Sequence, residues 1–535
     1  MKYIIVLLFV IFLFGNNVNA QQRVKIDVDA TKTVGQLTPF WSSQIIHPTE
    51  FLLTDWGNNF LKLLKKSGAA EQYIRIYNQP EQAIRVSKKG VITYDWSQFD
   101  DMADLIIAKG NKINVVFYGM PYEIAAHPEA TRTRPYGSKV CFSTPKNYQL
   151  WEDLCIDFSK HVIQKYGISK VKTWDFTCWN EPDLSSFWYK ADLEEYLKLY
   201  DHFTYAVKSV NKNIRVGGPA LSGTNTYNHP ERFNFFLEHI VNGKNYATKE
   251  TGSPIDFLSV HTYGGTGGHG GPGREFPDVE YMMEQEIRLA NIRDEYPLLR
   301  DVPINIAEWG ISASGTKGLK AEPMTDTRNS EYAAAFFTTL VADHIKMQQE
   351  NDRNIRQFTF CSSGYERIPE HDFMGYRTFD TKNGFHKPIL NVYKLLKKLD
   401  SHLIEVKKNS DDKHITIFAT KDKNSIKIVV TNFQNNEIYN DGKTYNISIL
   451  LKSYWSKNSK VKFSHWRIDK SHSNSYTAYK ALGSPELPNP IQIDQIKSKM
   501  ELELLEPSVS VKLRDLEEIN FQLPCNAVSM IEIVK

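Results

Sequence analysis

The chain has 535 residues, of which 41% are hydrophobic and 12% aromatic, so it can build one large domain and a smaller companion. Its 65 basic and 62 acidic residues leave a net charge of +3, which argues against nucleic acid as a partner. The five cysteines lie at long intervals without disulfide-framework or zinc spacing, so we expect mostly free, buried thiols.

Residues 1–20 have the pattern of a secretory signal peptide. Lys2 provides the positive start, Ile4 to Phe14 the apolar segment and Val18-Asn19-Ala20 the cleavage site. No later stretch approaches the roughly 20 apolar residues of a membrane helix, and no cysteine near the cleavage site offers a lipid attachment point. We therefore expect a secreted or periplasmic protein with no membrane partner once the signal is removed.

From residue 35 to 400, apolar or β-branched runs alternate with amphipathic helical stretches, the pattern of a parallel sheet built from βα units. Eight such runs predict an α/β fold, a (β/α)8 TIM barrel. The predicted strands are Leu37 to Ile45, Tyr73 to Tyr77, Ile113 to Gly119, Val171 to Trp179, Ile214 to Gly218, Phe257 to His261, Ile304 to Glu308 and Gln357 to Phe360. The predicted helices are Asn58 to Ser67, Phe99 to Lys109, Asn147 to Lys165, Asp192 to Val210, Tyr281 to Glu295, Ser330 to Gln349 and Lys387 to Leu399.

Residues 402–535 have a different pattern of polar and apolar residues. Short runs of alternating polar and apolar residues, such as His414 to Phe418 and Ser425 to Asn432, are separated by Asn, Asp, Lys and Gly. This pattern predicts a C-terminal antiparallel β-sandwich. We expect the early strand at 23–28 to be added to this second domain.

The predicted fourth barrel strand ends in Trp179-Asn180-Glu181-Pro182. Barrel enzymes hold their catalytic groups at this C-terminal rim, and Pro182 ends the strand ladder. The predicted seventh strand ends in a second carboxylate, Glu308. The alternatives are that Glu181 caps the next helix and that Glu308 is a solvated strand end, but the two signals together favour a shared cleft.

Two facing carboxylates suit cleavage of a glycosidic bond, because the leaving oxygen needs a proton and the developing oxocarbenium ion needs a nucleophile or a base. A separation of about 5–5.5 Å would indicate retention through a covalent intermediate. At that distance two ionised carboxylates repel by about 3 kcal/mol, which favours one protonated and one ionised group. The histidines show no metal-ligand spacing, so we expect neither a metal nor an organic cofactor.

These residues resemble glycoside hydrolase family 39, the family of β-D-xylosidases and α-L-iduronidase among the retaining barrel glycosidases. The resemblance covers nearly the whole mature chain. It rests on Pro39-Phe40-Trp41, Tyr73-Ile74-Arg75, Trp179-Asn180-Glu181-Pro182, His261-Thr262-Tyr263, Ala307-Glu308-Trp309, Gly384 to Pro388, Arg467 to Asn474 and Gly483-Ser484-Pro485.

The resemblance implies that Glu181 is the general acid/base and Glu308 the nucleophile. It implies that Asn180 binds the sugar hydroxyl next to the anomeric carbon. Arg75 and Tyr263 are expected near the nucleophile, although Arg75 also fits a structural ion pair. The further predicted substrate contacts are Tyr77, Trp179, His261 and Trp309, and His261 also fits a satisfied barrel-end histidine.

Three departures from the family pattern bear on the substrate. The second strand has Arg75-Ile76-Tyr77 where relatives show Arg-x-His. The eighth strand, Phe358 to Ser362, lacks the tryptophan on which the sugar often packs in xylosidase-type relatives. After the sixth strand the chain reads His261-Thr262-Tyr263-Gly264 and lacks the basic residue by which iduronidase-like relatives bind a uronate carboxylate, which favours a neutral sugar. A compensating cation on a loop, such as Arg274 or Arg367, would reverse this preference.

We therefore expect an exo-acting, β-xylosidase-like glycosidase that releases a terminal neutral sugar from oligo- or polysaccharides. Two alternatives stay open. One is another specificity on the same fold, an arabinose- or galactose-containing disaccharide or a uronide. The other is a non-catalytic carbohydrate-binding pseudo-glycosidase. Assembly as a homo-oligomer is also left open.

Overall fold

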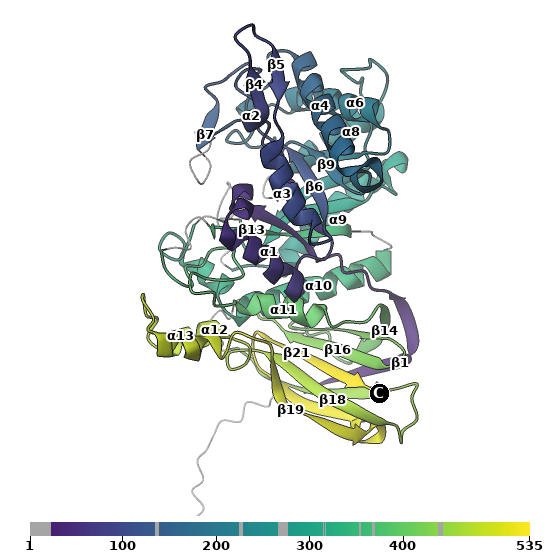
Figure 1. Ribbon diagram of the computed structural model, residues 1–535. Helices are drawn as coiled ribbons and strands as arrows, with labels where there is room; N and C mark the ends of the chain where they lie inside the picture. The colour runs from purple at the N-terminus through teal and green to yellow at the C-terminus, as the bar shows by residue number, and fades with distance from the viewer. Residues whose placement is uncertain are drawn as a thin grey trace, which may run out of the picture.

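The computed structural model describes residues 23–133, 139–223, 228–265, 276–313, 315, 317–351, 355–365, 370–436 and 442–535. A barrel sits on a smaller β-domain, with the C-terminus in the β-domain (Figure 1). The predicted signal peptide and the loop residues Arg274 and Arg367 lie outside the described residues. Within these ranges no helix combines the length and the apolar character needed to cross a bilayer.

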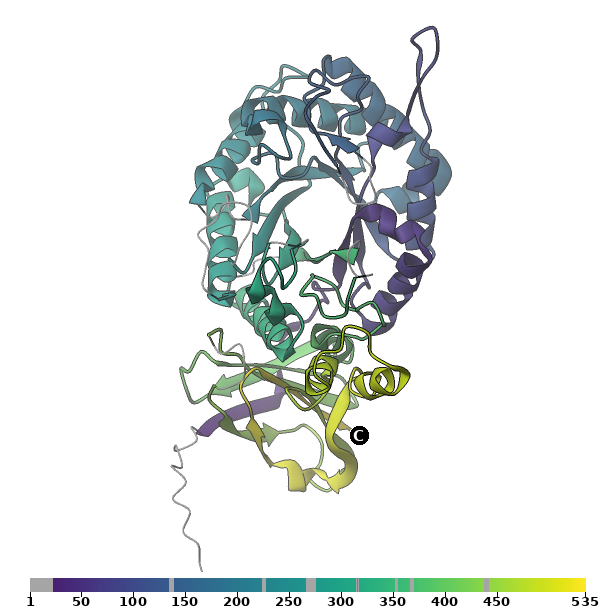
Figure 2. The ribbon, with the colours of Figure 1, turned by 90° about the vertical axis from the view of Figure 1, so that its left-hand side faces the viewer.

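The barrel is closed by eight parallel strands in the order β10-β11-β12-β13-β2-β3-β6-β9, ringed by helices (Figure 2). This confirms the predicted (β/α)8 barrel. The first strand begins later than predicted, because residues from Pro39 to Ser42 form a turn in which Ser42 N–H donates to the Pro39 carbonyl. The barrel strands are β2 Ser43–His47, β3 Tyr73–Tyr77, β6 Lys112–Phe117, β9 Asp175–Cys178, β10 Arg215–Leu221, β11 Phe257–Tyr263, β12 Ile304–Gly310 and β13 Ile355–Ser363.

The long barrel helices begin at side-chain caps that the sequence supplies. Thr54, Asn147, Asp192 and Asp278 each accept a backbone N–H of the first turn, which satisfies one of the donors left free there. These helices are α1 Asp55–Ser67, α3 Ser97–Ile107, α4 Tyr148–Tyr166, α6 Leu193–Val210, α8 Pro230–Asn242, α9 Val279–Asp294, α10 Glu331–Asn351 and α11 Pro388–Leu396.

Helix α8 is not among the helices named from the sequence. Its apolar face consists of Phe233, Phe236, Leu237 and Ile240, which are buried against the barrel. Shorter pieces connect the main elements. They are η1 Thr49–Leu53, α2 Pro80–Ala83, the hairpin β4 Ile84–Val86 and β5 Ile92–Tyr94, the hairpin β7 Thr131–Thr133 and β8 Lys139–Cys141, α5 Ile168–Val171, η3 Tyr189–Ala191, η4 Pro297–Leu299 and η5 Pro323–Arg328.

The β-domain has nine strands in the hydrogen-bonded order β19-β18-β21-β16-β15-β14-β1-β17-β20. Pairs are antiparallel except that β1 runs parallel to β17, a departure from the purely antiparallel expectation. Residues from both ends of this order share one core, as in a sandwich. The elements are β1 Arg23–Gln36, β14 His402–Lys408, β15 Ile415–Lys421, β16 Ser425–Asn432, β17 Tyr445–Lys452, β18 Lys460–Ile468, β19 Glu503–Lys512, η7 Leu513–Leu516, β20 Glu518–Leu523 and β21 Ala527–Val534.

The early segment predicted at 23–28 is part of β1, which is longer than predicted. It lies between β14 and β17, with Ile26 opposite Lys408 on one side and Ile449 on the other. Strand β1 therefore completes a domain whose other strands all lie after residue 401. Pairing strands so far apart in the chain costs loop-closure entropy.

The barrel and the β-domain share a continuous apolar core. Phe433, Val429 and Met530 of the β-domain belong to the same buried cluster as the barrel helices. The helix pair α12 Ser475–Ala481 and α13 Pro490–Lys497 adds a second contact, since Tyr476 packs on Phe373 of the loop after β13. All five cysteines are free and buried, as expected.

Candidate active site

Glu181 lies at the rim of the barrel on a sharply turned segment directly after β9. Trp179 and Glu181 both have left-handed backbone, with φ of 64° and 49°. Residues other than glycine rarely adopt this conformation, and it is concentrated at functional sites. The Glu181 N–H donates to the Ala220 carbonyl at 2.9 Å, which fixes the turn against the neighbouring strand.

Glu308 reaches the same rim from β12. It lies opposite His261 of β11 in the strand register, next to a register shift between Val260 and His261. Successive strand residues point to opposite faces of a sheet, so Glu308 points into the barrel while its neighbours point out. Glu181 and Glu308 are only 6% and 7% exposed, so both carboxylates are almost completely shielded from solvent.

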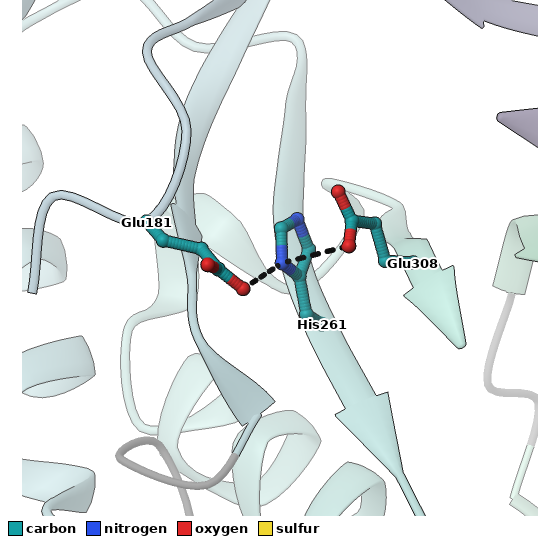
Figure 3. Close-up of side chains that lie close together, drawn as sticks. All are labelled: Glu181, His261 and Glu308. Carbon is teal, nitrogen blue, oxygen red and sulfur yellow. Dashed lines mark hydrogen bonds and ion pairs between the residues drawn. The ribbon is translucent and has the colours of Figure 1, made fainter. Parts of the chain in front are cut away.

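The two carboxylates face one another across His261 (Figure 3). One oxygen of Glu181, one oxygen of Glu308 and a ring nitrogen of His261 all lie within 4.8 Å of one another. His261 Nδ1 is 2.8 Å from Glu181 Oε1 and 3.7 Å from Glu308 Oε2. The spacing is close to the about 5–5.5 Å of retaining glycosidases and well below the about 6.5–9.5 Å of inverting ones.

Arg75 of β3 links the nucleophile candidate to the sugar-binding candidate. Its Nη1 donates to Glu308 Oε1 at 2.6 Å, and its Nη2 donates to Asn180 Oδ1 at 2.7 Å. The side chain is fully buried, so this ion pair is shielded from water and strong. The same Asn180 oxygen is 3.5 Å from the Tyr77 hydroxyl.

The surroundings of Glu308 favour its ionised form. Burial alone raises the pKa of this carboxyl, but the charges of His261 and Arg75 and a 2.7 Å hydrogen bond from the Tyr263 hydroxyl outweigh burial and hold the pKa well below its usual range. Burial raises the pKa of both Tyr77 and Tyr263, so both phenols remain protonated donors. Glu308 is therefore an anion at any ordinary pH.

Two predicted substrate contacts need correction. Trp309 is fully buried, and its indole is stacked between Phe337 and Phe358 at centroid distances of 4.9 Å. Because it follows Glu308 in a strand, it points out toward the helices, a consequence of strand alternation that the sequence already contained.

Trp179 is also fully buried. It packs edge-on against Trp188 at 4.8 Å, and its Nε1 donates to the Phe187 carbonyl at 2.9 Å. Neither Trp179 nor Trp309 offers a face to a sugar. The other predicted contacts, Asn180, Arg75, Tyr77, His261 and Tyr263, converge on the two carboxylates through the contacts described above.

Glu181, His261 and Glu308 are close enough to share a cation. However, Arg75 already places a positive charge 2.6 Å from Glu308, which disfavours a second cation at the same carboxylate. The arrangement suits acid/base and nucleophilic chemistry better than metal binding.

One further residue near the site, Arg377 in the loop after β13, is not among the predicted site residues. Its guanidinium lies over the Tyr263 ring at 4.8 Å from the centroid, behind the phenol that contacts Glu308. No local motif marks this arginine, because only the closure of the barrel brings the loop to β11.

A closed parallel barrel with two facing carboxylates at its C-terminal rim defines a glycosidase, a hydrolase of O-glycosyl bonds. A family model described as glycosyl hydrolases family 39 matches residues 24–511, so the chain belongs to that family.

Known relatives agree with this assignment. The chain is 26% identical over 528 residues to a beta-xylosidase of Caldicellulosiruptor saccharolyticus, covering 95% of this chain and 98% of the relative. It is 23% identical over 416 residues to the alpha-L-iduronidase of Mus musculus, covering 73% of this chain and 60% of the relative. The crystal structure of a monomeric beta-xylosidase from Caulobacter crescentus CB15 superposes with a TM-score of 0.79 at 23% identity, covering 95% of this chain and 99% of that one, and so shares the fold.

Proposed function

We propose that the protein is an exo-acting, retaining glycosidase of β-xylosidase type that releases a terminal neutral sugar by double displacement. The observation that carries this proposal is the pair of carboxylates within 4.8 Å, one of them held ionised. Similarity over nearly the full length to a beta-xylosidase supports the choice of sugar.

In the first step Glu181 donates its proton to the glycosidic oxygen while Glu308 attacks the anomeric carbon. Arg75 and Tyr263 hold one oxygen of Glu308 each, which orients the carboxylate and keeps it ionised before attack. Asn180 accepts from Arg75 through Oδ1, so its Nδ2 remains as the donor for the hydroxyl next to the anomeric carbon.

In the second step the glycosyl–enzyme ester is hydrolysed. Esterification removes the charge of Glu308, and Glu181, now deprotonated, takes a proton from the attacking water. His261 holds Glu181 at 2.8 Å, so the same carboxyl stays in place for both steps. The ester bond then breaks and Glu308 leaves as the carboxylate that Arg75 and Tyr263 stabilise.

The two roles can be separated with azide. We expect Glu308→Ala to lower kcat by about 10³-fold or more, a loss of about 4 kcal/mol in transition-state stabilisation. Azide should rescue it and give a glycosyl azide of inverted configuration, because azide enters the space of the nucleophile. Glu181→Ala should instead give a glycosyl azide of retained configuration, because azide attacks the covalent intermediate. Undiminished hydrolysis by Glu308→Ala would refute the mechanism and leave a different site to be found.

The sugar is tested with a panel of aryl glycosides. We expect the highest kcat/KM with the β-xyloside, and low values with arabinosides, galactosides and uronides. A preference for the iduronide would show that the substrate specificity is that of the alpha-L-iduronidase relatives. No turnover of any glycoside would favour a carbohydrate-binding pseudo-enzyme.

We also propose that the protein is exported, on the basis of residues 1–20 alone. Intact-mass analysis of the protein from its native host should give a chain that begins near Gln21. A mature protein that still carries Met1 to Ala20 would contradict export by this route.

A further inference from the structure

Arg377 is a buried cation that packs on Tyr263, the residue whose hydroxyl contacts the nucleophile. It is 6% exposed, and its guanidinium covers the Tyr263 ring at 4.8 Å from the centroid. The hydroxyl of the same Tyr263 donates to Glu308 Oε2 at 2.7 Å. Tyr263 therefore contacts both the Arg377 guanidinium and the Glu308 carboxylate.

The hydrogen-bond acceptors of Arg377 are neutral. Its Nε donates to Ser363 Oγ at 3.0 Å, its Nη1 to the Ser312 carbonyl at 3.4 Å and its Nη2 to Cys361 Sγ at 3.4 Å. Burial raises the pKa of Cys361 to about 12, so the thiol carries no charge. These acceptors fix the guanidinium in place without neutralising it, and its field therefore extends toward the pocket.

The backbone around Arg377 is shaped to hold it. The Ser363 N–H donates to the Arg377 carbonyl at 2.8 Å, which ties the loop to the end of β13. A Cβ at Gly310, two residues after Glu308, would come within 3.0 Å of Arg377 Cδ, and a Cβ at Gly315 within 2.3 Å of Nη2. Two glycines thus leave the space that the arginine fills.

We propose that Arg377 is a positioning residue for the nucleophile, acting through Tyr263. Its guanidinium holds the phenol ring at the angle that aims the hydroxyl at Glu308, and its charge favours the ionised carboxylate before attack and after release. This inference rests on the proposed function, in which Glu308 must be an anion at both of these points. Arg377 does not itself contact Glu308, so it differs from Arg75, which does.

Several other groups also act on Glu308 and must be accounted for in any pH measurement. They face it from β3, β11, β13 and the segment after β9, and they are Arg75, Tyr77, His261, Tyr263, Cys361 and Glu181. The single Arg377 variants therefore leave these groups unchanged, and Tyr263 is replaced only to test its coupling to Arg377. All variants are compared by the acid limb of kcat/KM, which reports the free enzyme.

The experiment measures pH profiles of kcat/KM for Arg377→Gln, Arg377→Lys and Tyr263→Phe in the full-length enzyme, together with the double variant Tyr263→Phe/Arg377→Gln. For Arg377→Gln we expect the acid limb to move up by about one pH unit, because the pKa of Glu308 rises when a nearby cation is removed. We expect kcat to fall about tenfold, because the phenol that aims its hydroxyl at Glu308 is no longer held in place. KM should stay within about threefold, since no substrate contact is lost.

Two comparisons show whether the effect passes through the phenol. Arg377→Lys keeps the charge but cannot lie flat over the ring, so its acid limb should stay close to that of the wild type while kcat falls about threefold. In the Tyr263→Phe background, Arg377→Gln should lower kcat by less than about twofold, because coupled residues are not additive.

Arg328→Gln is the matched control. Arg328 is also buried and donates to the same Ser312 carbonyl at 3.2 Å, to the Gly375 carbonyl at 2.9 Å and to the Lys317 carbonyl at 3.4 Å. It should lower the melting temperature and leave the acid limb in place.

An unmoved acid limb in a folded Arg377→Gln variant, or additive losses in the double variant, would overturn the proposal and leave Arg377 a scaffold residue. If Arg377→Gln does not fold, Arg377→Lys decides: full wild-type kcat in that variant would equally overturn it. Neither result touches the proposed function, which is tested separately by the Glu308→Ala variant and by the panel of aryl glycosides.

Discussion

Replacing Arg75 with methionine removes the cation closest to the nucleophile while keeping much of the side-chain volume. Arg75 Nη1 lies 2.6 Å from Glu308 Oε1 inside the barrel. With charge centres about 4 Å apart and an effective dielectric near 20, their attraction is about 4 kcal/mol. This corresponds to about three pKa units of the Glu308 carboxyl.

The sign of the effect follows from the direction of the shift. In the wild type the pKa of Glu308 is held below its usual range, so the ionised nucleophile is present above that pKa and is lost only at very low pH. Without Arg75 the pKa rises, and activity should be lost at a higher pH as the solution is acidified. We expect the acid limb of kcat/KM to move up by one to three pH units, with about a 10²-fold loss at the optimum.

The assay is a pH series of kcat/KM with an aryl glycoside, with circular dichroism as a check of folding. Arg356→Met is the matched control, because Arg356 pairs with Asp175 at 2.5 Å at the opposite end of the same barrel. It should lower the melting temperature without moving the acid limb. If Arg75→Met folds and its acid limb stays within about half a pH unit of the wild type, the electrostatic reasoning is wrong.

Two further predictions concern stability. Trp309→Ala should lower the free energy of unfolding by about 3–5 kcal/mol, because it leaves a cavity between Phe337 and Phe358, and KM should stay unchanged in the folded fraction. A raised KM with an unchanged melting temperature would show that the indole contacts the sugar. His465 is buried in the β-domain, and burial lowers its pKa from 6.5 to about 3, so the folded state resists protonation and loses stability as the pH falls from 6.5 toward 3. His465→Gln should therefore unfold with less pH dependence between pH 7 and pH 4 in thermal denaturation, and equal pH dependence in both proteins would contradict this assignment.

The barrel could be predicted from the sequence because its strands are local signals. A parallel strand covered on both faces is a nearly continuous apolar run, and the run from Tyr73 to Tyr77 became β3 with both ends as predicted. The carboxylates could be predicted for a related reason. A residue at the end of such a run lies at the barrel rim, which is where Glu181 and Glu308 are found.

Errors arose where the local signal was weak or was not applied. The fourth strand is predicted to begin at Val171, but Val171 is the last residue of the short helix α5, and β9 begins only at Asp175. The second error is Trp309, which is predicted as a substrate contact but directly follows Glu308 in β12. The alternation of strand side chains places it on the outer face instead.

The amino-acid sequence by itself determined which segments become barrel strands and which two acids end them, because strand formation and strand termination depend on neighbouring residues. Only the tertiary structure decided which groups meet in the pocket. Arg75 and Glu308 are 233 positions apart, and Arg377 reaches Tyr263 from a loop with no motif of its own. Such contacts follow from the closure of the barrel, which sets the distance between strand ends that no local pattern encodes.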